Sequence, residues 1–273
     1  MSNAPLLYSG RKPHESPAGA TAPVPILALL FLAAAAVYAS AGFGGGSTYT
    51  ALLALRDPDP AVVPIVSLSC NILVVALGAW RFGRAGHVDV RRSWPLFAAS
   101  VPMAFVGGAL PVPRLAFIGM LSLSLFAAGL LLLRQPREGA TAEPRTYRRW
   151  LELLIGGALG LLAGIVGIGG GIYLAPVLHL LRWGGAHAIA GTSALFILVN
   201  SLAGLAGQFA KSGAAMGQVL ADHWLLFPAV AVGGLIGSTL GSRRFDPHLL
   251  KRLTGVLILV VAAQLAWRFV ALI

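Results

Sequence analysis

Two short runs of glycine are the residues of this 273-residue chain with the clearest capacity to form a ligand site. Gly42-Phe43-Gly44-Gly45-Gly46 and Gly167-Ile168-Gly169-Gly170-Gly171 share one pattern: a glycine, an apolar residue and three further glycines. Three successive glycines interrupt a helix, and the missing Cβ atoms let other backbone come close. Each run therefore predicts a broken helix at that point in the chain.

A helix that begins directly after such a break presents unpaired N–H groups and the positive end of its dipole. Two such helix starts that meet form an anion site without a buried lysine, and hydroxyl and amide side chains nearby complete it. The predicted substrate-binding residues are Gly44, Gly45, Gly46, Ser47, Thr48, Tyr49, Asn71, Gly169, Gly170, Gly171, Tyr173, Thr192, Ser193 and Asn200.

Close packing of helices is the alternative interpretation of glycine in such a chain. Packing uses small residues at a spacing of four, and we favour it for Gly160 with Gly164 and for Gly233 with Gly237 and Gly241. Three glycines in a row do not fit that spacing, so the paired runs favour a binding role.

Polar side chains within apolar runs have a structural alternative as well, because they form hydrogen bonds between helices. For any single Ser or Thr we favour that alternative, whereas for Asn71 and Asn200 the two interpretations are balanced. His179 is a candidate proton carrier for a coupled mechanism, with a hydrogen-bonded interfacial histidine as the favoured alternative. No carboxylate falls in the middle of an apolar run, which argues against a relay of buried Asp or Glu.

Enzyme signatures are absent from the sequence: there is no H-E-x-x-H, G-x-S-x-G, P-loop or C-x-x-C motif. The one cysteine, Cys70, and scattered histidines predict no metal cluster. We expect neither a metal nor a cofactor, and we expect that the protein is not an enzyme.

The elements that must hold these residues follow from composition. Hydrophobic residues make up 57% of the chain and charged residues 11%, with a mean hydropathy of +0.82, whereas a soluble domain carries about a quarter charged residues. We predict an all-α polytopic membrane protein with apolar segments at 25–41, 47–55, 60–80, 94–111, 114–133, 150–166, 170–182, 186–210, 222–241 and 249–272. Segments 47–55 and 170–182 are too short for a hydrocarbon core of about 30 Å.

Recurrence of the glycine motif at a fixed offset predicts an internal duplication. The predicted organisation is a flexible N-terminal tail at 1–23, a first membrane repeat at 24–133, a basic cytoplasmic linker at 134–149 and a second membrane repeat at 150–273. Five segments in each half, an odd number, place the two repeats in the membrane with inverted topology. Two alternatives stay open for 25–55 and 150–182, which are either full spans or re-entrant pairs.

The formal net charge of +11 is explained by topology instead of by nucleic acid binding. Fourteen of the twenty basic residues can be placed on one side of the membrane, the cytoplasmic side by the positive-inside rule. They are Arg81, Arg84, Arg91, Arg92, Arg134, Arg137, Arg145, Arg148, Arg149, Arg182, Arg243, Arg244, Lys251 and Arg252. Both termini are then outside the cytoplasm. Tryptophans at segment ends, Trp183 among them, fit the aromatic belts of a membrane protein.

Two stretches, GIVGIGGGIYLAPVL (164–178) and AGTSALFILVNSLAG (190–204), together with the duplicated glycine motif, resemble the sulfite exporter TauE/SafE family, also described as 4-toluene sulfonate uptake permeases. The resemblance covers about 25–272. It implies a permease of the bacterial cytoplasmic (inner) membrane for sulfur-containing anions such as sulfite, thiosulfate, sulfonates or sulfoacetate. The first half departs from the pattern, since Ser67-Leu68-Ser69 stands where a Thr-Ser pair is expected.

Together these observations predict a secondary transporter in the lipid bilayer, in which the two repeats rock around a midplane site. A passive anion channel on the same scaffold is one alternative, and a membrane-embedded subunit without transport activity is another. The sequence leaves open the anion, the direction of transport, the coupling ion (proton or sodium) and the oligomeric state, for which a homodimer is one option.

Overall fold

The computed structural model of the protein describes residues 24–40, 44–133, 147–240 and 247–273, and its regular elements there are all α-helices. The eleven helices of those residues are α1 (Val24–Ser40), α2 (Gly46–Arg56), α3 (Val63–Arg84), α4 (Val90–Ala109), α5 (Arg114–Leu133), α6 (Arg149–Val166), α7 (Gly171–Leu180), α8 (Ala186–Ser212), α9 (Ala215–Asp222), α10 (Leu226–Leu240) and α11 (Pro247–Ala271). The predicted tail at 1–23 and most of the predicted linker at 134–149 lie outside the described residues, as do Gly42, Phe43 and Gly241.

The all-α prediction is confirmed, and so are the two short segments. α2 has 11 residues and α7 has 10, and each begins at the last glycine of its run. α9 is not among the predicted segments, because this helix buries none of its residues and carries no apolar run.

Four helices are long and apolar enough to cross a membrane by length and composition: α3, α5, α6 and α8. A fifth candidate arises if α9 and α10, which meet at a bend of 63°, count as one broken span. The described residues also contain shorter apolar helices, among them α1 and α7. The chain is thus a multi-pass membrane protein with helices of unequal length.

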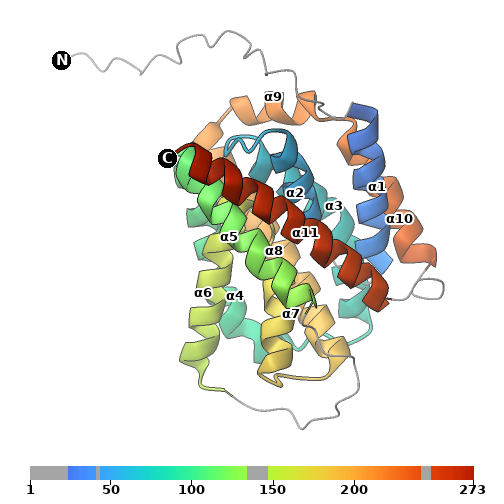
Figure 1. The fold of residues 1–273 in the computed structure, drawn as a ribbon. Coiled ribbons are helices and arrows are strands. Elements are labelled where there is room, and N and C mark those ends of the chain that lie inside the picture. Colours follow the sequence, from blue (N-terminus) through green and yellow to red (C-terminus); the bar gives the residue numbers. More distant parts are fainter. Residues whose placement is uncertain (1–23, 41–43, 134–146, 241–246) are drawn as a thin grey trace.

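Helices from the two halves of the chain pair with one another. α4 packs on α6, α1 on α10, α5 on α11 and α3 on α8, and Figure 1 shows α5 and α11 side by side across one face of the bundle, with α9 across one end. At the offset of the glycine motifs, α1 corresponds to α6, and α4 corresponds to α9 together with the first part of α10. The contact of α4 with α6 is therefore the counterpart of the contact of α1 with α10, and the two halves interlock.

Glycines allow these helix pairs to approach at backbone distance. A Cβ at Gly164 of α6 would collide with the carbonyl oxygen of Ala104 in α4 and lie 2.8 Å from the Gly108 nitrogen. A Cβ at Gly237 of α10 would lie 2.8 Å from the Cα of Ala36 in α1. The packing interpretation is confirmed for these glycines and for Gly160 and Gly233, which face backbone in the same way.

Substitution of Gly164 with alanine is expected to lower the stability of the bundle by about 1–3 kcal/mol, the usual effect of overpacking. Gly157 on the same helix is the matched control, because its Cβ would lie 3.7 Å from the nearest atoms, an ordinary contact. Thermal unfolding of the purified variants in detergent measures the difference. Equal melting temperatures for Gly164→Ala and Gly157→Ala would contradict the packing role.

Each short helix folds back beside the helix that precedes it. Leu27 at the start of α1 and Leu53 and Arg56 at the end of α2 line one pocket. At the start of α6, Glu152 accepts a hydrogen bond of 3.0 Å from Nε1 of Trp183, three residues beyond α7. Each of the two pairs, α1 with α2 and α6 with α7, therefore begins and ends at a single end of the bundle, which favours the re-entrant alternative over two full spans.

Candidate functional site

The two short helices begin in the same way, at a glycine in the left-handed region. Gly45 precedes α2 with φ 79° and Gly170 precedes α7 with φ 79°, a conformation that glycine adopts without the penalty of a Cβ. Neither helix start has a side-chain cap. The N–H groups of Thr48 and Tyr173 donate to the carbonyl oxygens of Gly45 and Gly170 at 3.0 and 3.1 Å. Each helix start therefore offers the N–H groups of its first two residues and its positive dipole end.

The two glycine runs meet inside the bundle. The Nδ2 of Asn71 in α3 donates a hydrogen bond of 3.1 Å to the carbonyl oxygen of Ile168. Thr50 of α2 donates from Oγ1 to the carbonyl oxygen of Gly167 at 3.4 Å. A Cβ at Gly46 would lie 2.6 Å from the Ile168 oxygen, so the start of α2 touches the second run directly.

We call the place where Gly44–Gly46 meet Gly167–Gly171 the junction. Asn71 lies at its centre, fully buried and surrounded by glycines of both runs. A Cβ at Gly44 would lie 2.5 Å from its Oδ1, and a Cβ at Gly169 would lie 2.8 Å from its Nδ2. Gly46 leaves space for the same amide. The Nδ2 bonds to Ile168, whereas the Oδ1 has no hydrogen-bond partner in the described structure.

Ser201 of α8 also lies at the junction, although it is not among the predicted residues. Its side chain is fully buried, and a Cβ at Gly169 would lie 2.9 Å from its Oγ, which has no hydrogen-bond partner among the described residues. Ser201 is four residues beyond Ile197, so the two side chains lie on one face of α8, and both face Gly169. This helical spacing is the feature of the sequence that could have indicated Ser201.

Ser67 and Thr50 hold the first break in place, and both are absent from the predicted set. Ser67 donates from Oγ to the carbonyl oxygen of Gly46 at 3.1 Å, and the Oγ of Ser67 and Oγ1 of Thr50 are 2.7 Å apart. Ser67 corresponds to Thr192 at the offset of the repeat, and that correspondence was the available signal. Both hydroxyls bond to backbone carbonyl oxygens of the glycine runs, Ser67 to Gly46 and Thr50 to Gly167.

Of the three predicted residues of α8, Ser193 lies near the second break through its backbone. Thr192, Ser193 and Asn200 are fully buried. The backbone oxygen of Ser193 would be 3.3 Å from a Cβ at Gly171. The hydroxyl oxygens of Thr192 and Ser193 have no hydrogen-bond partner in the described part of the chain, and Asn200 donates from Nδ2 to Phe196 of its own helix at 2.8 Å.

Other predicted residues bond to the surrounding helices instead of the junction. Thr48 donates to the hydroxyl of Tyr38 in α1 at 3.2 Å, and Ser47 contacts the same hydroxyl. The ring of Tyr49 stacks on Phe31 with centroids 4.8 Å apart. Ser47 and Thr48 thus support the first turn of α2, whereas the Tyr49 hydroxyl would lie 3.0 Å from a Cβ at Gly45 and has no hydrogen-bond partner in the described part of the chain.

Tyr173 and His179 of α7 also lie away from the junction. The Tyr173 hydroxyl donates to the carbonyl oxygen of Ser124 in α5 at 2.9 Å, which ties α7 to α5. His179 is in the last turn of α7, eight residues beyond Gly171 and thus about 12 Å along the helix axis. The structure does not bring His179 to the glycine runs.

No cationic side chain is buried at the junction within the described residues. Among all the described residues, Glu152 is the one charged residue that is buried. It bonds to Trp183 at the start of α6, far from the glycine runs. Trp183 itself is 1% exposed, so its expected place in an interfacial aromatic belt is wrong. The contacts at the junction therefore come from backbone dipoles, amides and hydroxyls.

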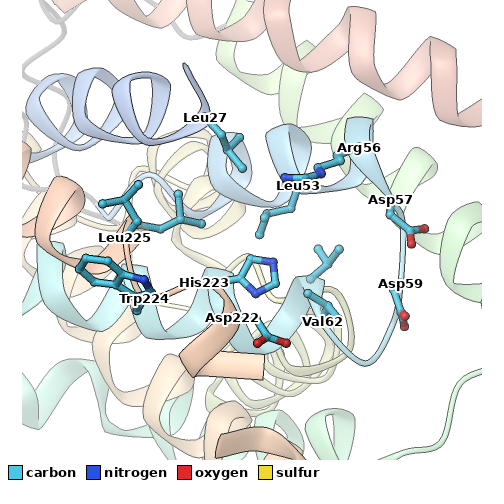
Figure 2. Close-up of a pocket in the computed structure, with 12 residues that line it drawn as sticks. Leu27, Leu53, Arg56, Asp57, Asp59, Val62, Asp222, His223, Trp224 and Leu225 are labelled. Atoms are coloured by element: carbon cyan, nitrogen blue, oxygen red, sulfur yellow. The ribbon is translucent and has the colours of Figure 1, made fainter. Parts of the chain in front are cut away.

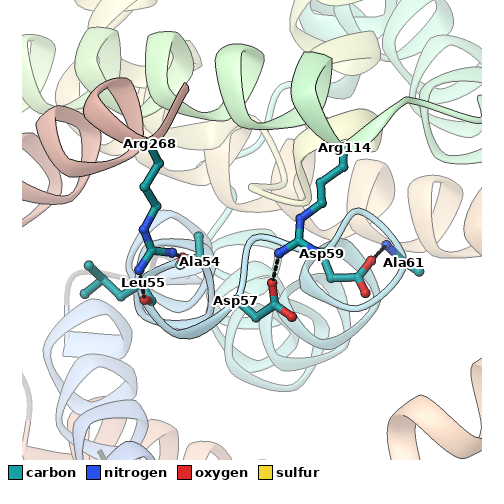
Figure 3. Close-up of polar contacts among 7 residues, drawn as sticks. All are labelled: Ala54, Leu55, Asp57, Asp59, Ala61, Arg114 and Arg268. Atoms are coloured by element: carbon teal, nitrogen blue, oxygen red, sulfur yellow. Dashed lines mark hydrogen bonds and ion pairs between the residues drawn. The ribbon is translucent and has the colours of Figure 1, made fainter. Parts of the chain in front are cut away.

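The far end of α2 is anchored by arginines, as Figure 3 shows. Arg268 near the end of α11 donates to the carbonyl oxygen of Leu55 at 3.1 Å and to that of Ala54 at 3.5 Å. Arg114 at the start of α5 forms a salt bridge with Asp57. Because the last carbonyls of a helix have no partner within it, these contacts fix α2 from its end and so hold its first turn at the junction.

A pocket of about 400 Å³ lies at the same end of the bundle (Figure 2). Leu27 and Leu53 line it, together with Val62 and the bend between α9 and α10 at His223 and Trp224. The pocket thus borders α2 at the end opposite its first turn. In the described residues no group of three or more His, Cys, Asp or Glu side chains could hold a metal ion.

Comparison with known proteins gives two matches. The model of a family described as Sulfite exporter TauE/SafE matches residues 26–265. The probable membrane transporter protein y4hK of Sinorhizobium fredii (strain NBRC 101917 / NGR234) is 33% identical over 226 residues, which cover 82% of this chain and 90% of that protein. No solved structure matches the chain.

Proposed function

The chain belongs to the sulfite exporter TauE/SafE family and is a membrane transporter, not an enzyme, and on that premise we propose that it is a secondary transporter for small sulfur-containing anions. The class includes sulfite, thiosulfate, sulfonates and sulfoacetate. The relative from Sinorhizobium fredii, named a probable membrane transporter, is bacterial, and this supports a place in the bacterial cytoplasmic membrane.

The meeting of two uncapped helix starts at Asn71 is the observation that carries the proposal. The first turns of α2 and α7 present N–H groups without a side-chain cap and positive dipole ends, and the unpartnered hydroxyl of Ser201 on α8 lies beside the second glycine run. Backbone N–H groups at helix starts bind oxyanions, and transporters use broken helices near the bilayer midplane for this purpose. The substrate contacts are then the glycine runs, Asn71 and the buried hydroxyls of α8.

Inverted repeats that rock against each other are the proposed means of transport. The matched contacts of α4 with α6 and of α1 with α10 support such a repeat. Since each re-entrant pair approaches from its own end of the bundle, motion of the repeats would open the junction to either side in turn. By the positive-inside rule, the distribution of basic residues supports a linker in the cytoplasm and both termini outside it.

Counterflow is the experiment that tests this function. The purified protein, reconstituted into liposomes preloaded with unlabelled sulfite, is expected to accumulate radiolabelled sulfite from outside without net current. Liposomes without protein and liposomes with the folded Gly170→Leu variant are the controls, and both are expected to stay near background. Single-channel currents in place of counterflow would favour the passive channel.

A thermal-shift screen against sulfite, thiosulfate, sulfate, taurine and sulfoacetate ranks the substrates, because a ligand that binds the native state raises its apparent stability. Absence of both a thermal shift and counterflow for every anion, with protein that is folded in detergent, would overturn the proposed function.

A further inference from the structure

The charge that the junction can balance follows from its two helix starts. Each helix N-terminus carries the equivalent of about +0.5 elementary charge, so the starts of α2 and α7 together offer about +1. Among the described residues, Glu152 is the one buried charged side chain, and it lies at the opposite end of α6 from the second glycine run. In a medium of low dielectric constant an unbalanced charge is costly. The junction is therefore matched to a single negative charge.

A hydrogen-bond acceptor points into this same junction. Asn71 commits its Nδ2 to the Ile168 carbonyl oxygen, which fixes the orientation of the amide. The Oδ1 then lies 2.5 Å from the position of a Cβ on Gly44, the residue directly before the N-cap of α2. This oxygen is fully buried and unpartnered in the described structure. An amide oxygen repels an anion that has no donor and accepts a hydrogen bond from one that has.

The hydroxyl of Ser201 supplies a group of the opposite kind on the facing helix. It can donate to an anionic oxygen, and its Oγ is buried without a partner beside Gly169. Asn71 and Ser201 are thus two unsatisfied groups on α3 and α8 that flank the glycine runs. A buried polar group without a partner is costly, and a ligand with one acceptor and one donor satisfies both.

We propose that the junction binds a singly charged oxyanion that carries its own hydrogen-bond donor, such as hydrogen sulfite or a hydroxyalkanesulfonate, in preference to a dianion. The proposal rests on the proposed function and names the ionic form that the site selects. Asn71 Oδ1 accepts from the ligand, Ser201 donates to it, and the two helix starts balance its charge.

Three anions of similar size separate charge from donor capacity. Hydroxyethanesulfonate has one charge and a hydroxyl donor; propanesulfonate has one charge and a methyl group in place of the hydroxyl; sulfoacetate has two charges at neutral pH and no donor. Calorimetric titration of the wild-type protein in detergent is expected to give the tightest binding for hydroxyethanesulfonate, by about ten-fold over each of the other two.

Two variants assign the effect to residues. In Ser201→Ala we expect binding of all singly charged anions to weaken by about ten-fold, since a hydrogen bond to a charged group is lost, while the melting temperature stays level or rises. In Asn71→Ala we expect hydroxyethanesulfonate to lose its advantage over propanesulfonate. A fall in melting temperature for Ser201→Ala would assign that hydroxyl a structural bond and remove it from the site.

The outcomes that overturn the inference are distinct from failure of the proposed function. Equal binding of hydroxyethanesulfonate and propanesulfonate by the wild-type protein overturns the donor requirement, and tightest binding of sulfoacetate overturns the single charge. Absence of binding for all three overturns the inference as a whole. If sulfite counterflow proceeds in each of these cases, the proposed function stands; if counterflow fails too, both fall.

Discussion

Replacement of Gly46 with alanine is expected to lower sulfite transport at least about a hundred-fold, through overpacking of the junction by a single methyl group. A Cβ at Gly46 would lie 2.6 Å from the Ile168 carbonyl oxygen, 2.8 Å from Cγ of Asn71 and closer still to its Nδ2. The carbonyl belongs to backbone and cannot rotate away. The first turn of α2 must then move away from the second glycine run, which separates the two helix starts.

Gly217→Ala in α9 is the matched control, because nothing lies within 4 Å of its Cβ position. We expect this variant to transport like the wild-type protein and to be slightly more stable, as alanine is favoured over glycine within a helix. Counterflow rates, normalised to protein recovered in liposomes, measure the effect. Normal transport by folded Gly46→Ala would mean that the two runs need not touch.

Asn71→Ala is expected to reduce both stability and transport, since it removes the side chain that joins the two halves of the site. The variant leaves the Ile168 carbonyl oxygen buried without its 3.1 Å hydrogen bond, at an expected destabilisation of about 1–3 kcal/mol. Transport should fall to near background because the two breaks lose their common contact. Thermal unfolding and counterflow on the same preparation give the two values.

A double-mutant comparison with Gly44→Ala separates packing from function. A Cβ at Gly44 would lie 2.5 Å from Oδ1 and 3.2 Å from Cγ of Asn71, and its third neighbour is a side-chain methyl of Ile197. Gly44→Ala should therefore be less destabilising in the Asn71→Ala background than in the wild-type protein. Transport should be lost in the Gly44→Ala variant and in the double variant alike. Additive effects on stability would contradict the contact between Gly44 and the amide.

The sequence predicted the two short helices and the use of glycine in close helix packing. The duplicated glycine motif located the starts of α2 and α7 to within a residue, and the lengths of the apolar runs anticipated that both helices are short. Glycines at a spacing of four anticipated close packing, and the structure supplies the partners, α4 for α6 and α1 for α10. These features depend on local composition and spacing, which a sequence displays directly.

The parts of the site that differ between the halves could not be derived from the repeat. Asn71 crosses to the opposite glycine run, but at the same offset the second half has Phe196, so the duplication gives no hint of this contact. Tyr173 has a position in the motif that suggested substrate contact, yet its hydroxyl bonds to Ser124 in α5. Such directions depend on which helices become neighbours in three dimensions.

The interlocked pairing of helices also sets an order for biogenesis. α1 leaves the ribosome before its packing partner α10, from which the helices α2 to α9 separate it along the chain. Contacts that join distant parts of a chain form slowly, because a long loop must close first. Until then the face of α1 that packs on Gly233 and Gly237 has no protein neighbour from α10. A nascent chain truncated after α5 therefore lacks the contacts of α1 with α10, α4 with α6, α5 with α11 and α3 with α8, and presents that face of α1 to lipid or to the insertion machinery.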